Sequence, residues 1–162
     1  MKNNYKIGIV GLGYVGSAIK SFFEKKIQVF SYDIHKQKST ESSLKSLLKK
    51  EVDFLFICLP TPMNEDGSTY LNNINQTLHE IDSFGFNGVV VLKSTIPPKT
   101  SENFSKKYDS LSIIFNPEFL TEANFLEDFS NQKFIILGGE KLDCEKVSKL
   151  YEEFFKKDYI HI

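Results

Sequence analysis

A six-residue stretch, GLGYVG at residues 11–16, constrains the fold of this chain more than any other feature. It directly follows a β-type run, YKIGIV at residues 5–10. Apolar residues then recur at helical spacing, at Ile19, Phe22 and Phe23. A GxGxxG pattern is weak alone, but between a strand and a helix it is typical of a dinucleotide-binding turn. The start of the chain therefore predicts a nucleotide-binding α/β domain.

Each glycine of this stretch has its own physical role in such a turn. Gly11 allows the tight turn from strand to helix, and Gly13 lets a pyrophosphate approach the backbone. Gly16 lets the helix pack close to the strand. Because the first turn of a helix has free N–H groups and a partial positive charge, the backbone of Tyr14 and Val15 is expected to face the phosphates. These five residues are therefore predicted to bind the cofactor.

An acidic residue follows at the distance that such a site requires. Asp33 lies 22 residues after Gly11, at the end of a second β-type run, IQVFSY at residues 27–32. A carboxylate there accepts hydrogen bonds from the ribose hydroxyls of the adenosine and repels the 2′-phosphate of NADP. NAD is therefore the predicted cofactor. The alternative is a glycine turn beside an unrelated surface aspartate. It does not account for the consecutive order of a strand, the glycines, a helix, a second strand and the acidic residue.

Composition limits the remaining classes of function. The chain has 162 residues, 41% of them apolar, which is enough for one domain with a substantial core. Its net charge is −1, so neither nucleic acid nor an anionic membrane is an expected partner. No apolar run approaches the roughly 20 residues that span a bilayer, and residues 1–4 leave no room for a signal peptide. We therefore expect a cytoplasmic protein. Cys58 and Cys144 lack metal-site spacing, so no metal is expected.

Strand and helix signals alternate along the rest of the chain. Apolar runs predict strands at residues 52–59, 88–92, 111–115 and 133–137, with a last short strand at 159–162. Apolar residues at helical spacing predict helices at residues 41–50, 71–84, 98–107, 117–129 and 140–156. This alternation predicts a Rossmann-like, doubly wound α/β fold: a single domain over residues 1–162 with a mostly parallel sheet and helices on both faces. Ligands of such sheets bind outside the carboxyl ends of the strands.

Unusual sequences follow two of the predicted strands. Residues 59–64, LPTPMN, place Thr61 between two prolines, whose fixed φ angles lower the entropy cost of holding it against a ligand. The alternative is an ordinary stiff loop. Residues 93–98, KSTIPP, place the hydroxyls of Ser94 and Thr95 within reach of a nicotinamide or a reacting water. Alternatively, these hydroxyls only satisfy local backbone groups.

A third unusual sequence, NPEFLTE at residues 116–122, follows the next strand. Asn116 is a plausible N-cap and Pro117 a first-turn residue for the helix predicted over residues 117–129. Glu118 and Glu122 are four residues apart, so that helix would carry both carboxylates on one face. The alternative for Glu118 is that it only complements the helix dipole.

Together these motifs resemble the N-terminal NAD-binding domain of the UDP-glucose/GDP-mannose dehydrogenase family. The matching segments are GLGYVG at 11–16, TP at 61–62, KSTIPP at 93–98 and NPEFL at 116–120, in the family's order and at similar spacing. The NPEFL segment is the most specific, since ordinary Rossmann domains lack it. The resemblance covers nearly the whole chain. It argues against another NAD enzyme, such as a β-hydroxyacid dehydrogenase, which shares the first motif.

Enzymes of this family oxidise the C6 alcohol of a nucleotide sugar to a carboxylate with two NAD⁺. A cysteine traps the aldehyde as a thiohemiacetal, and water later cleaves the thioester. The resemblance implies that Thr95 helps to place this water and that Glu118 is its general base. Phe119 and Leu120 would offer backbone contacts to the sugar nucleotide. The NAD contacts implied beyond the glycine loop are those of Asp33, Lys38, Leu59, Pro60, Thr61, Pro62, Ser94 and Glu122.

The sequence also departs from the family's pattern. In the family, a central helical region and a C-terminal α/β domain supply the cysteine nucleophile and most of the sugar-nucleotide site. We expect both parts to be absent here, because neither Cys58 nor Cys144 matches the nucleophile's context. Lys99 and Ala123 stand where the family commonly has glycine, and Lys133 where it often has arginine. Lysine cannot make a bidentate grip on a planar anion as arginine can.

Two classes of function therefore stay open. In the first, the chain is part of an oxidoreductase and gains the missing groups from a second polypeptide or from a longer parent chain. In the second, it is a free-standing NAD-binding module without dehydrogenase turnover. Self-association is a further open point, because a face that the family normally covers would expose apolar surface.

Overall fold

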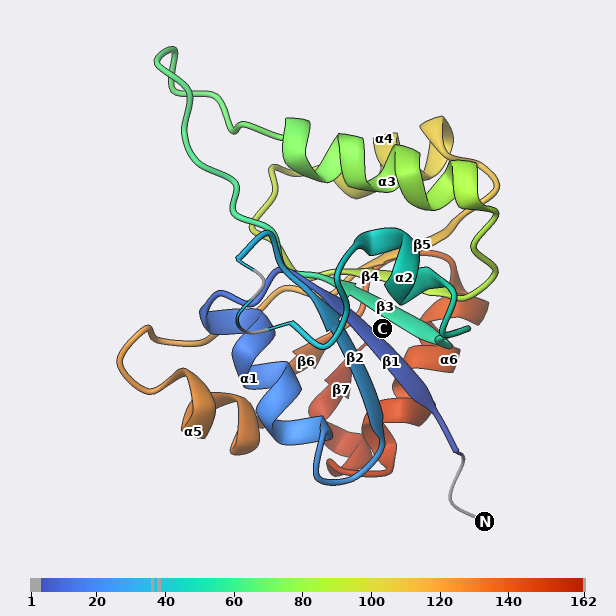
Figure 1. The fold of residues 1–162 in the computed structure, drawn as a ribbon. Helices are drawn as coiled ribbons and strands as arrows, with labels where there is room; N and C mark the ends of the chain where they lie inside the picture. Colours follow the sequence, from blue (N-terminus) through green and yellow to red (C-terminus); the bar gives the residue numbers. More distant parts are fainter. Residues whose placement is uncertain (1–3, 36, 38, 162) are drawn as a thin grey trace.

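The computed structural model describes residues 4–35, 37 and 39–161. Five parallel strands form one sheet in the order β2-β1-β3-β4-β5 (Figure 1). The strands are β1 (Lys6–Val10), β2 (Gln28–Tyr32), β3 (Phe54–Ile57), β4 (Val89–Leu92) and β5 (Ser112–Phe115). The helices are α1 (Tyr14–Phe23), α2 (Leu44–Leu48), α3 (Asn72–Phe84), α4 (Thr100–Lys107), α5 (Phe125–Ser130) and α6 (Lys141–Glu152).

The sheet is covered by helices on both faces. Side chains of one face, such as Ile9 and Phe56, belong to a core that includes residues of α1, α5 and α6. Side chains of the other face, such as Leu55 and Ile57, belong to a core with α2, α3 and α4. Figure 1 shows α3 and α4 on the side of the sheet opposite α1 and α6. The predicted Rossmann-like α/β fold with a mostly parallel sheet is therefore confirmed.

All five strands of the sheet end at the same level. Their last residues pair with one another in register, in the order Tyr32, Val10, Ile57, Leu92 and Phe115. Backbone hydrogen bonds of 2.8–2.9 Å continue this ladder for one residue beyond the strands. The residues of that next row are, in sheet order, Asp33, Gly11, Cys58, Lys93 and Asn116. The sheet order reverses direction at β1, which is the switch point where such folds bind ligands.

The helix predicted over residues 117–129 is wrong at its start. α5 begins at Phe125, and Asn116 does not cap a helix. The Asn116 side chain is instead held by distant groups: its Oδ1 accepts from the Tyr151 hydroxyl at 2.7 Å, and its Nδ2 donates to the Ile136 carbonyl at 2.8 Å. Glu118 therefore lies in a non-helical segment and shares no helical face with Glu122.

The sixth strand also differs from the prediction. Only β6 (Ile135–Ile136) forms within residues 133–137, and it pairs with β7 (Ile160–His161) in a separate two-stranded sheet. One antiparallel bridge, Phe115 to Gly138, joins this segment to the edge of the large sheet. The last helix and the last short strand are present, at slightly shorter bounds than predicted. A 3-10 turn, Lys157–Tyr159, connects them.

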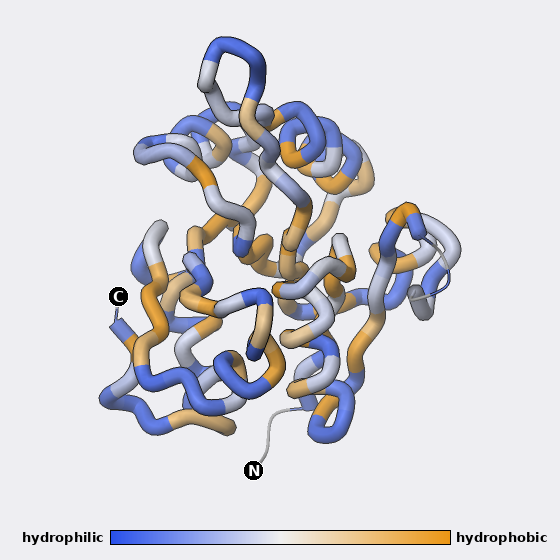
Figure 2. Tube along the Cα trace, turned by 90° about the vertical axis from the view of Figure 1, so that its left-hand side faces the viewer, coloured by the Kyte–Doolittle hydropathy of each residue, from blue (hydrophilic) through white to orange (hydrophobic). Residues whose placement is uncertain are grey.

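The segment between β3 and α3 forms a projecting arm, residues 62–70 (Figure 1). The Tyr70 N–H donates to the Pro62 carbonyl at 2.8 Å, and Met63 forms an antiparallel bridge with Thr69. Gly67, with φ 84°, takes a left-handed conformation in the turn at the tip. Figure 2 shows this tip as hydrophilic, while hydrophobic segments gather in the middle of the molecule. No helix in the described part of the chain is long and apolar enough to cross a membrane.

Substituting Gly16→Ala should destabilise the fold. A Cβ at Gly16 would collide with the carbonyl oxygen of Gly11 and lie 3.3 Å from a methyl group of Ile9. Overpacking of this kind costs roughly 2 kcal/mol, so thermal unfolding followed by circular dichroism should show a clearly lower midpoint. Gly13→Ala is the matched control, because a Cβ there meets nothing within 4 Å. Equal losses in both variants would contradict the proposed close approach of helix and strand.

Candidate cofactor site

A cavity of about 850 Å³ lies at the carboxyl ends of the strands. This volume falls in the range of small-molecule and cofactor sites. The predicted site residues that line it are Gly11, Gly13, Tyr14, Val15, Asp33, Leu59, Pro60, Thr61, Ser94, Thr95 and Glu118. The cavity therefore brings together residues that follow β1, β2, β3, β4 and β5.

The glycine loop has the conformation that the sequence predicts. Gly11 has φ 90°, a left-handed value that favours glycine, and a Cβ there would lie 2.6 Å from the Cys58 carbonyl oxygen. Gly13 faces open space, since an added Cβ would meet nothing within 4 Å. Helix α1 starts directly after it, without a side-chain cap. The first N–H groups of α1 are thus available to an anion such as a pyrophosphate.

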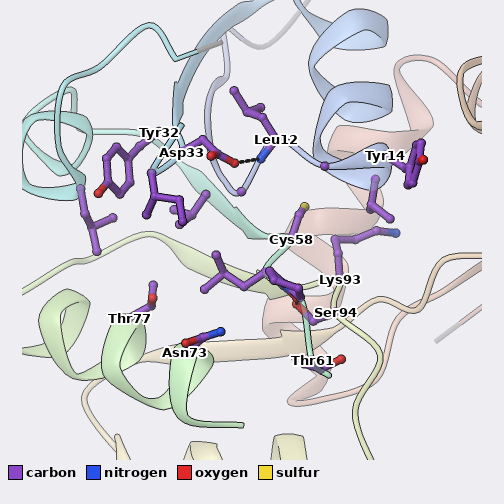
Figure 3. Close-up of a pocket in the computed structure, with 18 of the residues that line it drawn as sticks. Leu12, Tyr14, Tyr32, Asp33, Cys58, Thr61, Asn73, Thr77, Lys93 and Ser94 are labelled. Atoms are coloured by element: carbon purple, nitrogen blue, oxygen red, sulfur yellow. Dashed lines mark hydrogen bonds between the residues drawn. The ribbon is translucent and has the colours of Figure 1, made fainter. Parts of the chain in front are cut away.

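Asp33 is anchored to the glycine loop. Its Oδ2 accepts from the Leu12 N–H at 2.6 Å (Figure 3). Its Oδ1 accepts from the His35 N–H at 2.7 Å. Each carboxylate oxygen accepts more than one hydrogen bond, so both can still accept from a ribose. The same carboxylate therefore fixes the loop that would hold the pyrophosphate.

Two hydroxyl groups tie the loops after β3 and β4 together. The Thr61 hydroxyl donates to the Thr95 carbonyl at 2.7 Å. The Ser94 hydroxyl donates to the Leu59 carbonyl at 2.7 Å. These bonds match the alternative considered for Ser94, that its hydroxyl satisfies backbone groups. They also make the wall of the cavity between the two loops rigid.

Lys93 is the most unusual group in the cavity wall. Only 2% of the residue is exposed, and its Nζ donates to the Asn116 Oδ1 at 3.2 Å and to the Pro117 carbonyl at 3.4 Å. Both acceptors are neutral, and among the described residues no carboxylate forms an ion pair with Lys93. Burial lowers the pKa of Lys93 to about 8, although the nearby Cys58 and Glu118 act in the opposite direction.

Glu118 is the carboxylate at this end of the cavity. It is half-buried, and its Oε2 accepts from the Leu120 N–H at 2.7 Å. The second oxygen, Oε1, is left for another donor. Because the Lys93 ammonium holds the neighbouring Pro117 carbonyl, the segment that carries Glu118 is fixed to the end of β4.

The cavity leaves some predicted residues outside its lining. Gly16 acts through packing, and Pro62 lies at the base of the arm. Glu122 is exposed. The Phe119 ring is 60% exposed and packs edge-on against Phe134 at 6.0 Å between ring centroids. Leu120 is partly buried and packs against the core that includes α1. Lys38 lies outside the described residues.

Sequence reasoning missed the wall that α3 contributes. Polar residues on one side of this helix line the cavity: Asn73, Gln76, Thr77 and Glu80. Figure 3 shows Asn73 and Thr77 across the cavity from Tyr32 and Asp33. Their spacing of three and four residues is a helical face, and that was the available signal. Lys93 and Cys58 were also missed as lining residues, although Lys93 directly follows one predicted buried strand and Cys58 lies near the end of another.

Neither cysteine has the state of an activated nucleophile. Burial raises the pKa of the Cys58 thiol to about 12, so at neutral pH it is protonated. Cys144, on α6, is fully buried in the core, and burial raises its thiol pKa as well. A nucleophilic cysteine requires the opposite shift.

The fold and this cavity define a dinucleotide-binding domain of the Rossmann type. The sequence pattern of the NAD-binding domain of the UDP-glucose/GDP-mannose dehydrogenase family matches residues 39–155. The chain belongs to this family, and NAD is the cofactor of the domain that matches.

Curated relatives are longer than this chain. An uncharacterised protein of Methanocaldococcus jannaschii is 30% identical over 93% of this chain and 20% of its own length. The UDP-glucose 6-dehydrogenase of Campylobacter jejuni is 26% identical over 97% of this chain and 47% of its own length. The chain thus spans less than half the length of these relatives.

Solved structures show the same fold. A UDP-glucose dehydrogenase from Pyrobaculum islandicum superposes with a TM-score of 0.86 at 23% identity, over 99% of this chain and 46% of that chain. A GDP-mannose dehydrogenase from Pseudomonas aeruginosa superposes with a TM-score of 0.75 at 22% identity, over 96% of this chain and 45% of that chain. At these identities the likeness concerns the fold of the cofactor-binding part.

Substituting Asp33→Ala should weaken NAD binding about 10- to 100-fold, because hydrogen bonds to a charged group contribute about 1.5–3 kcal/mol. It also removes the acceptor of the Leu12 N–H and loosens the loop. Titration calorimetry would measure the affinity. Asp53→Ala is the matched control, since Asp53 also accepts a backbone N–H, that of Lys6 at 2.8 Å, but lines no part of this cavity. An unchanged NAD affinity in Asp33→Ala would refute the ribose assignment.

Proposed function

We propose that this chain is the cofactor-binding part of an NAD-dependent nucleotide-sugar 6-dehydrogenase, which oxidises the C6 alcohol of a UDP- or GDP-linked sugar to a carboxylate. The remaining catalytic groups would come from a longer parent chain or from a second polypeptide. The observation that carries the proposal is the position of Glu118. Its carboxylate lies in the same cavity as Asp33 and the glycine loop, although ordinary dinucleotide-binding domains lack its segment.

The cavity has two chemically different ends. Asp33 follows β2, so the adenosine ribose is expected at that side of the sheet. Thr95 and Glu118 follow β4 and β5, on the other side of the switch point. A dinucleotide whose pyrophosphate lies on the glycine loop at β1 would therefore reach towards β4 and β5 with its nicotinamide. Bound NAD⁺ supplies the hydride acceptor there.

Glu118 and Thr95 would act on water at this end. The Leu120 N–H holds one oxygen of Glu118, which leaves the other to take a proton from a water molecule. The hydroxyl of Thr95 is suited to orient that water, because the Thr95 carbonyl is fixed by Thr61. The backbone of Phe119 and Leu120, directly beyond Glu118, would contact the sugar nucleotide. We extend the cofactor contacts to Pro62, Lys38 and Glu122 by family resemblance alone.

The cysteines favour a chain that does not turn over by itself. With its thiol pKa at about 12, Cys58 supplies almost no thiolate at neutral pH, and Cys144 lies in the core. We therefore expect the purified chain to bind NAD but to produce no NADH with UDP-glucose, a UDP-N-acetyl sugar or GDP-mannose. The measurement is NADH absorbance, with calorimetric NAD binding of the same sample as the positive control. NADH production by the chain alone would contradict the expectation that catalysis needs groups from a parent chain or a second polypeptide.

A capture experiment tests the oxidoreductase proposal against the binding-module alternative. The tagged chain would be purified from its own cells under mild conditions and assayed with the same three sugar nucleotides. Sustained NADH production by the captured assembly supports the proposal. Absence of activity in the assembly, with NAD binding intact, favours the free-standing module. The raised pKa of the Cys58 thiol favours this second candidate, a free-standing NAD-binding module, because the thiol is protonated at neutral pH.

Substituting Glu118→Gln should leave NAD affinity within about twofold of the wild type, because glutamine keeps an oxygen for the Leu120 N–H and Glu118 has no predicted cofactor bond. In an active assembly the same change should slow the hydrolytic step about 100-fold or more, as loss of a general base does. Calorimetry and single-turnover kinetics would separate the two effects. A large loss of NAD affinity would instead assign Glu118 to the cofactor or to the fold.

A further inference from the structure

We propose that the Lys93 ammonium lies against the nicotinamide end of the bound cofactor and makes this site bind NADH more tightly than NAD⁺. Lys93 would thus be a specificity-determining residue for the redox state of the cofactor. The inference depends on NAD binding by this domain and not on the sugar that is oxidised.

The position of Lys93 follows from the register of the sheet. Asp33 and Lys93 belong to the same row of residues beyond the strand ends, with Gly11 and Cys58 between them. Neighbouring strands lie about 4.8 Å apart, so Lys93 starts roughly 14 Å from Asp33 along the row. That separation suits a dinucleotide that begins at the ribose acid and crosses the glycine loop. Figure 3 shows Lys93 and Asp33 on different sides of the cavity.

The side chain of Lys93 is held in place by hydrogen bonds, and among the described residues no carboxylate forms an ion pair with it. Within this part of the chain, its Nζ donates hydrogen bonds to two neutral oxygens, those of Asn116 and Pro117, at 3.2 and 3.4 Å. The charge of Glu118 acts on it from farther away. The Asn116 oxygen is shared with the buried hydroxyl of Tyr151. A buried ammonium that is not in direct contact with a carboxylate is costly, so its retention beside a cavity points to a use within that cavity.

The charge of Lys93 acts differently on the two forms of the cofactor. The nicotinamide ring of NAD⁺ carries a positive charge, whereas that of NADH is neutral. A nearby ammonium in a partly desolvated cavity therefore repels only the oxidised form. Since the rest of the two molecules is the same, every other contact cancels when their affinities are compared. In a dehydrogenase the same repulsion favours transfer of a hydride to the cofactor.

Because Lys93 can lose its proton, the proposal predicts that NAD⁺ affinity depends on pH. The groups that face it are Cys58 at the end of β3, Glu118 beyond β5 and, through Asn116, Tyr151 on α6. Burial raises the pKa of Cys58 to about 12 and that of Tyr151 further still, so neither titrates near neutral pH. Burial lowers the pKa of Lys93 to about 8. As the pH rises through this value the ammonium is lost, so NAD⁺ affinity should increase while NADH affinity stays nearly constant.

The test is a comparison of NADH and NAD⁺ affinities in the wild type and in Lys93→Met, measured by calorimetry at pH 7. Methionine preserves length and removes the charge. We expect the wild type to prefer NADH, and the ratio of the two affinities to fall about tenfold in Lys93→Met. Lys106→Met is the matched control, because Lys106 is exposed on α4 and lines no part of the cavity. It should leave the ratio unchanged.

A purely structural role for Lys93 gives a different result. Lost hydrogen bonds to Asn116 and Pro117 would weaken both cofactor forms alike and leave their ratio as it was, which would overturn the proposal. If Lys93→Met does not fold, the pH dependence of the wild-type protein tests the proposal: its preference for NADH over NAD⁺ must decline between pH 7 and pH 9. A ratio that is independent of pH, or absence of binding by both forms, would refute the proposal.

Discussion

The common level at which the five parallel strands end is the constraint on which the rest of the structure depends. Parallel strands in register place the residues that follow them in one row, about 4.8 Å apart. In this chain the row contains a carboxylate, a turn glycine, a thiol, an ammonium and an amide: Asp33, Gly11, Cys58, Lys93 and Asn116. Residues distant in the sequence thereby become neighbours along one cavity. The site is thus a consequence of sheet register, and the loops add hydroxyl bonds that hold it.

The parts of the site that the sequence predicts are those with local physical causes. The conformation of Gly11 is required by its own turn, and the position of Asp33 depends on one strand-helix-strand unit. Lys93 and the polar face of α3 were not predicted as cavity residues, because their roles depend on which strands and helices become neighbours. A lysine after an apolar strand looks like the beginning of an exposed loop. Only the burial of β4 between β3 and β5 makes it a buried cation.

The error in the helix at residues 117–129 has the same origin. Asn116 followed by Pro117 is a good local signal for a helix start, and it would apply if the amide of Asn116 were free. Tertiary partners occupy that amide instead: Lys93 and Tyr151 donate to its oxygen, and the Ile136 carbonyl accepts from its nitrogen. The backbone that follows stays non-helical as far as Asn124. As a result Glu118 reaches the cavity wall and does not sit in a first helical turn.

The chemical groups at the two ends of the cavity differ, which fits the proposed division into a cofactor-binding end and a reacting end. At the end of β2, where we propose that the adenosine binds, the carboxylate of Asp33 accepts hydrogen bonds from two backbone N–H groups and can accept further ones. At the other side, burial keeps the Cys58 thiol protonated and lowers the pKa of the Lys93 ammonium, with Glu118 as the nearby carboxylate. A protonated thiol cannot trap an aldehyde, whereas a cation and a carboxylate can act on charge and protons. In the proposed reaction, these residues would therefore act on the cofactor and a water molecule, and the covalent step would require a thiolate from outside the described residues.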